Sequence, residues 1–76
     1  MNAPVSIYRF DPPMPQAFAE LARVELVQLA RTDDGVDVPA GTRGTVVGVW
    51  PGGEGYEVDF AAGLATVEAK HLVAVA

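Results

Sequence analysis

The clearest pattern of hydrophobic and polar positions lies after the middle of the chain, where Tyr56, Val58 and Phe60 alternate with Glu57 and Asp59. Strict alternation puts the two sets of side chains on opposite faces of a β-strand. We therefore expect a strand that buries its three apolar side chains in a core and leaves its two carboxylates in water.

Four further segments favour strands, because they combine β-branched residues with short apolar runs bounded by turn residues. They are residues 24–29, 45–50, 64–68 and 72–75. Turns containing glycine are expected at 33–35, 51–55 and 61–63, and a single 3-10 turn at 69–71. This arrangement predicts a mostly β fold, specifically a small five-stranded SH3-like barrel.

The N-terminal residues have a different character. Four prolines interrupt the first fifteen positions, which disfavours helix there and favours an extended arm. Residues 16–23 then carry Phe18 and Leu21 at helical spacing, so we expect a short helix of about two turns. The chain is accordingly divided into an arm with a short helix, residues 1–23, and a barrel, residues 24–76.

Apolar side chains outside the predicted core are candidates for protein binding. Tyr8, Phe10, Phe18 and Leu21 are too apolar for a solvated tail, although five strands complete a barrel without them. We expect these four to contact a second copy of the chain or another protein, with packing on their own barrel as the alternative. Trp50 adjoins a glycine-rich turn; packing at the barrel end is its stronger interpretation, and a binding role is the second.

Charge and composition limit the classes of partner that we expect the chain to bind. Ten acidic against five basic residues give a formal charge of −5, and the bases are spread singly along the chain, so we expect no binding to nucleic acid. No apolar run approaches the ~20 residues that cross a bilayer, and the proline-rich start is unlike a signal peptide. The chain has no cysteine, which fits a cytoplasmic protein.

The residues that carry chemistry favour structural roles. His71 is the only histidine, and Asp33, Asp34 and Asp37 lack the spacing of a calcium loop. The Gly-Thr-Arg-Gly run at 41–44 leads into a strand rather than into the helix that a phosphate loop needs. We therefore expect no catalytic residue, no metal site and no cofactor.

Three segments resemble a known family. They are Val-Gln-Leu at 27–29, Ala-Gly-Thr-Arg-Gly-Thr-Val-Val at 40–47, and Tyr-Glu-Val-Asp-Phe at 56–60. Small bacterial proteins grouped as domain of unknown function 4926 have a similar strand, a Gly-x-x-Gly-Thr-Val-Val turn and strand, and a Tyr-Glu-Val-Glu-Phe strand. The resemblance covers residues 24–75, with Asp59 in place of the usual glutamate. It implies an SH3-like barrel and no established activity.

A more distant likeness, carried by the fold and the Gly-Thr-Val pattern, is to the barrel of the nitrile hydratase β subunit. Together these observations predict a non-enzymatic protein-interaction module. Two alternatives remain: an accessory or small subunit of an enzyme complex, as the nitrile hydratase likeness implies, and an antitoxin-like protein that neutralises a basic partner.

Overall fold

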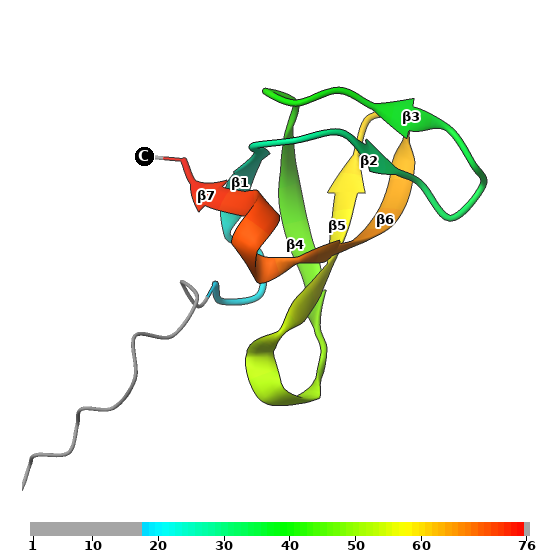
Figure 1. Cartoon of the computed structure of the whole chain (residues 1–76). Coiled ribbons are helices and arrows are strands. Elements are labelled where there is room, and N and C mark those ends of the chain that lie inside the picture. The colour runs from blue at the N-terminus through cyan, green and yellow to red at the C-terminus, as the bar shows by residue number, and fades with distance from the viewer. Residues whose placement is uncertain (1–17, 76) are drawn as a thin grey trace, which may run out of the picture.

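A computed structural model of the chain describes residues 18–75, and Figure 1 shows how they are arranged. Seven strands and two 3-10 turns follow one another within residues 18–75. They are β1 (Arg23–Leu26), β2 (Ala30–Arg31), β3 (Asp37–Val38), β4 (Arg43–Val49), η2 (Pro51–Gly53), β5 (Gly55–Phe60), β6 (Gly63–Glu68), η3 (Ala69–His71) and β7 (Leu72–Ala74).

Five of the strands form one antiparallel sheet in the order β6-β5-β4-β1-β7. The predicted mostly β fold with five main strands is confirmed, and η3 lies where a single 3-10 turn was expected. The sheet is not closed, however, because β6 and β7 are its two edges and do not pair with each other in the described part of the chain. The sheet is therefore strongly curved but open between these strands (Figure 1).

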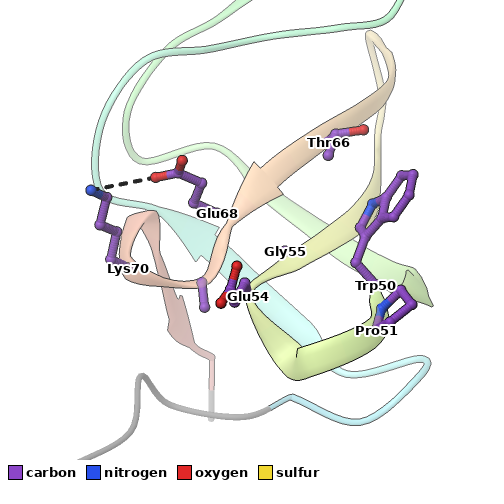
Figure 2. A pocket seen from close by; sticks show the side chains of 8 residues that line it. Trp50, Pro51, Glu54, Gly55, Thr66, Glu68 and Lys70 are labelled. Carbon is purple, nitrogen blue, oxygen red and sulfur yellow. Dashed lines mark ion pairs between the residues drawn. The ribbon is translucent and has the colours of Figure 1, made fainter.

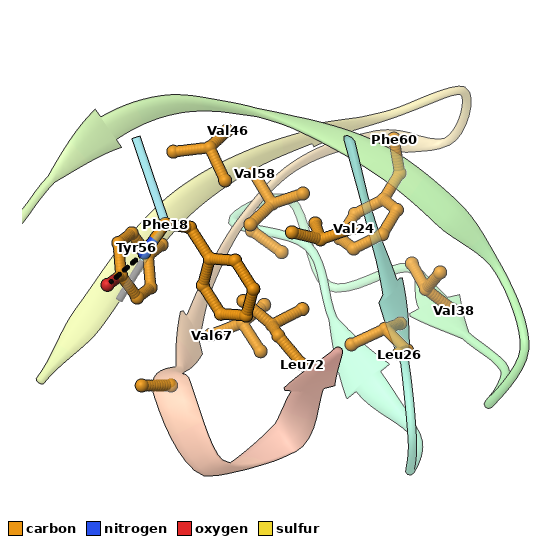
Figure 3. Close-up of a cluster of buried hydrophobic side chains, with 12 residues drawn as sticks. Phe18, Val24, Leu26, Val38, Val46, Tyr56, Val58, Phe60, Val67 and Leu72 are labelled. Atoms are coloured by element: carbon orange, nitrogen blue, oxygen red, sulfur yellow. Dashed lines mark hydrogen bonds between the residues drawn. The ribbon is translucent and has the colours of Figure 1, made fainter. Parts of the chain in front are cut away.

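The core fills the concave side of the sheet, as Figure 3 shows. Tyr56, Val58 and Phe60 are all buried, whereas Asp59 is exposed, so the alternation in β5 is confirmed. The other buried hydrophobic residues come from the other four strands of the sheet, from β3, from η3 and from the chain before β1. They are Phe18, Val24, Leu26, Val38, Val46, Ala65, Val67, Ala69 and Leu72.

The pairing of β4 with β5 contains an irregularity. Val46 lies opposite Val58, but Gly48 lies opposite Glu57, so β4 has one residue more than β5 in this interval. A β-bulge of this kind increases local twist and redirects the strand. Beyond it the β4–β5 hairpin projects past the rest of the sheet, and Val49 is half exposed there (Figure 1).

Between β1 and β4 the chain makes a long excursion, residues 27–42, which carries β2 and β3 as a separate hairpin. Thr32 closes its turn: the Thr32 N–H donates to the Val36 oxygen at 2.8 Å, and the Val36 N–H donates to Thr32 Oγ1 at 2.9 Å. The Asp33 N–H donates to the Leu64 oxygen at 2.8 Å. This contact ties the excursion to the start of β6.

The short helix expected before the first strand is not formed by its described residues. Residues 20–21 lie in a turn, and Leu21 has a positive φ of 70°, which a right-handed helix does not allow. The Leu21 N–H donates to the Val46 oxygen at 2.6 Å, and the Val46 N–H donates to the Ala22 oxygen at 2.9 Å. Pairing with β4 thus satisfies backbone groups that a helix of two turns would have to satisfy alone.

Phe18 is anchored to the core through Tyr56. Its N–H donates to the Tyr56 hydroxyl at 3.0 Å, and the two rings meet edge to face with centroids 5.3 Å apart (Figure 3). Both residues are buried, so this hydrogen bond is shielded from water. The contact fixes the chain before β1 against the β4–β5 hairpin.

We predict that Tyr56→Phe lowers the free energy of unfolding by about 1–2 kcal/mol, because it leaves the buried Phe18 N–H without an acceptor. Urea unfolding followed by circular dichroism measures the loss. Thr66→Val is the control, since it removes an exposed hydroxyl that donates to Glu57 at 2.9 Å, and it is expected to cost less than about 0.5 kcal/mol. Equal losses in the two variants would contradict the assigned role of the tyrosine hydroxyl.

Candidate functional site

An open hollow of about 620 Å³ lies at the projecting end of the β4–β5 hairpin, beside η3 (Figure 2). We call it the Trp50 groove. Its lining residues are Trp50, Pro51, Glu54, Gly55, Thr66, Glu68, Ala69 and Lys70. The volume lies within the range of ligand pockets, roughly 300–1,000 Å³, but the hollow is open to solvent. An open groove suits a segment of polypeptide better than a small enclosed ligand.

Trp50 forms one wall of the groove. It follows β4 directly, and its backbone N–H donates to the Gly55 oxygen at 3.0 Å, which closes the hairpin across η2. A Cβ placed on Gly55 would lie 3.5 Å from Trp50 Cδ1, so the indole packs over this glycine. The side chain nevertheless remains 51% exposed. The indole is thus positioned by the hairpin while much of its surface faces solvent.

The opposite wall comes from the end of β6 and from η3. Glu68 and Lys70 form an exposed ion pair at 3.5 Å, and Glu54 lies between them and Pro51 (Figure 2). The Ala69 N–H donates to the Glu54 backbone oxygen at 3.0 Å and joins the hairpin loop to η3. Gly55 pairs with Glu68 in the sheet, so the register of β5 and β6 also brings the two walls close to each other.

A second, smaller hollow of about 290 Å³ shares Trp50 with the first and is lined by Gly48, Val49 and Glu57 as well. Glu57 accepts a hydrogen bond from Thr66 Oγ1 at 2.9 Å, and its partner threonine also lines the Trp50 groove. Trp50 therefore lines two hollows, the first with Glu54 and Glu68 and the second with Glu57. The two hollows together present three carboxylates and one ammonium group.

The structure separates the residues that the sequence singled out for protein binding. Trp50 lines the groove and is half exposed. Phe18 is buried in the core, and Leu21 is 73% exposed beside β4 but does not line the groove. Tyr8 and Phe10 lie outside the described residues.

Sequence reasoning missed the charged side chains around Trp50. Glu54 and Glu68 are far apart in the sequence, and only the pairing of β5 with β6 brings them to one groove. A signal was available, because the turn after Phe60 sets the register of that hairpin. Counting outward from it places Glu68 opposite Gly55.

Three of the other side chains considered for chemistry, Asp37, Arg43 and His71, lie near a charged partner. Arg43 Nε lies 3.1 Å from Glu25 Oε1, and Arg31 Nε lies 3.0 Å from Asp37 Oδ1. His71 Nε2 lies 4.0 Å from the Glu68 carboxylate. Within residues 18–75, no three acidic or histidine side chains come together in a way that could hold a metal ion. The same part of the chain has no helix long and apolar enough to cross a bilayer.

Comparison of the chain with protein-family models, with curated proteins and with solved structures finds no match. The resemblance to domain of unknown function 4926 and the likeness to nitrile hydratase therefore stay predictions.

Proposed function

We propose that this chain is a non-enzymatic protein-interaction module built on an SH3-like barrel. Three features support the barrel: the strand order β6-β5-β4-β1-β7, the long excursion between β1 and β4, and the single turn η3 before the last strand. Small barrels of this type present binding surfaces on the loops at their ends. The Trp50 groove lies at such an end.

The half-exposed indole of Trp50 is the observation that carries the proposal. Tryptophan buries a large apolar area and is enriched among the residues that dominate protein interfaces. Here one part of the ring packs over Gly55, and the rest is available to a partner. A partly exposed aromatic side chain in an open groove suits the anchor of a protein contact.

The character of the groove argues for binding rather than catalysis. Its charged side chains, Glu54, Glu68 and Lys70, are exposed, and the last two form an ion pair in water. Catalytic groups act most strongly where water is excluded and their charges are not screened. An accessory subunit or an antitoxin-like protein would use the same surface, and these alternatives differ from the proposal only in the partner.

Affinity capture tests the proposal with matched variants. The tagged chain is used to capture proteins from the cells that produce it, beside Trp50→Ala and the control Val73→Ala, which removes an exposed valine on β7. We expect the unaltered chain and the control to retain the same partner, and Trp50→Ala to retain at least about tenfold less, as for an interface hot spot.

Quantitative mass spectrometry reads the captured proteins, and thermal melts confirm that the variants are folded. Equal capture by Trp50→Ala would show that the groove is not the interface. Absence of any protein above an empty-resin background would contradict the interaction module itself.

A further inference from the structure

The charges around Trp50 indicate what kind of partner fits the groove. We propose that it binds a segment of another protein rich in arginine or lysine, with a cationic side chain over the Trp50 indole and its neighbours against the surrounding carboxylates. This inference rests on the proposed function and specifies the chemistry of the partner.

The groove has a surplus of negative charge. Lys70 is its one basic side chain, and the Lys70 ammonium group already lies 3.5 Å from the Glu68 carboxylate. Glu54 and Glu57 form no ion pair with a base among residues 18–75, although Glu57 accepts the Thr66 hydroxyl. Each hollow that Trp50 lines thus contains one carboxylate without a cation from the described chain, Glu54 in the first and Glu57 in the second. A cationic segment would complement this charge.

The Trp50 indole is a second feature of the groove that attracts cations. Cations bind preferentially over the face of an aromatic ring, and tryptophan is the strongest of the aromatic residues in this respect. Trp50 is half exposed, and the carboxylates beside it would raise the local concentration of cations. A guanidinium group can stack on the ring and donate to a carboxylate at once, which favours arginine.

The β2–β3 hairpin of the described chain also has a surplus of carboxylates, Asp33, Asp34 and Asp37 against Arg31, but it has no aromatic side chain. Arg31 pairs with Asp37 on the β2–β3 hairpin, and Arg43 pairs with Glu25 between β4 and β1. A second copy of the chain is disfavoured as the occupant, because each copy carries a formal charge of −5. The groove therefore selects for a partner of opposite charge.

Titration of defined peptides tests this inference. Three peptides of equal length are compared, in which arginine, glutamine or glutamate alternates with glycine. Trp50 is the only tryptophan in the chain, so its fluorescence reports binding at the groove directly. We expect the arginine peptide to bind at least about tenfold more tightly than the glutamine peptide, with an affinity that falls as salt is added, and the glutamate peptide to bind least.

Matched charge variants separate the groove from the overall charge. Glu54→Gln/Glu57→Gln removes one carboxylate from each hollow, and Asp33→Asn/Asp34→Asn removes two exposed carboxylates from the turn between β2 and β3. Both double variants change the net charge equally. We expect the first to weaken binding of the arginine peptide about tenfold and the second to change it less than about twofold.

Equal binding of the arginine and glutamine peptides, absence of binding by the arginine peptide, or equal weakening by the two double variants would each overturn the inference. The capture experiment distinguishes failure of this inference from failure of the proposed function. A partner that requires Trp50 but is retained fully by Glu54→Gln/Glu57→Gln would leave the interaction module standing with a different kind of partner. A partner retained by Trp50→Ala would remove both.

Discussion

Replacing Phe60 by alanine is expected to lower the free energy of unfolding by about 3–5 kcal/mol. Phe60 ends β5, is only 3% exposed, and contacts the backbone of β4 at Gly44. Its ring lies in the buried core cluster. The surrounding side chains and backbone are closely packed, so they would fill only part of the cavity that alanine leaves. A small domain has a total stability of roughly 5 kcal/mol, so the variant would be largely unfolded.

Urea unfolding of Phe60→Ala, followed by circular dichroism, measures this loss. Leu64→Ala is the control, because Leu64 lies on the adjacent strand β6 but is 44% exposed. The control is expected to lose less than about 1 kcal/mol. A loss below about 1 kcal/mol in Phe60→Ala as well would mean that the register of β5 is incorrect.

Gly44→Ala is the second large effect, with an expected loss of about 1–3 kcal/mol from overpacking. A Cβ at Gly44 would lie 2.7 Å from Phe60 Cδ1 and 2.8 Å from the backbone oxygen of Asp59. Backbone atoms of a paired strand cannot move aside without breaking the β4–β5 ladder. Gly44 therefore allows the close approach of β4 and β5 over the core.

The matched control is Gly55→Ala in β5. A Cβ there would meet its nearest atom, Trp50 Cδ1, at 3.5 Å, which is an ordinary contact, so the change is expected to stay within about 0.5 kcal/mol. Thermal and urea unfolding of both variants make the comparison. Similar stabilities for the two would show that the space around Gly44 is not restrictive.

The strands could be predicted from sequence because their signals are local. Alternation in residues 56–60 and the glycine-rich turns on either side determine which side chains face the core. The predicted helix failed for the opposite reason. Phe18 and Leu21 do have helical spacing, but long-range contacts override it: Phe18 packs on Tyr56, and the backbone of Leu21 pairs with Val46.

The candidate site was only partly predictable. Trp50 could be singled out because it adjoins a glycine-rich turn, yet its exposed fraction is visible only once the hairpin is seen to project past the rest of the sheet. The carboxylates around it come from separate segments and meet only through the β5–β6 register. Single residues at turns are thus visible in a sequence, whereas a groove assembled by strand pairing needs the register first.

Photo-crosslinking in intact cells tests most directly whether the Trp50 groove is a protein interface. Lys70→p-benzoylphenylalanine places the probe in the groove, and Arg31→p-benzoylphenylalanine places it on the β2–β3 hairpin; the two native side chains are similarly exposed and each forms one exposed ion pair. The proposed function predicts a discrete adduct with another protein from position 70 and none from position 31. No adduct from position 70, or an adduct from position 31 alone, would contradict it.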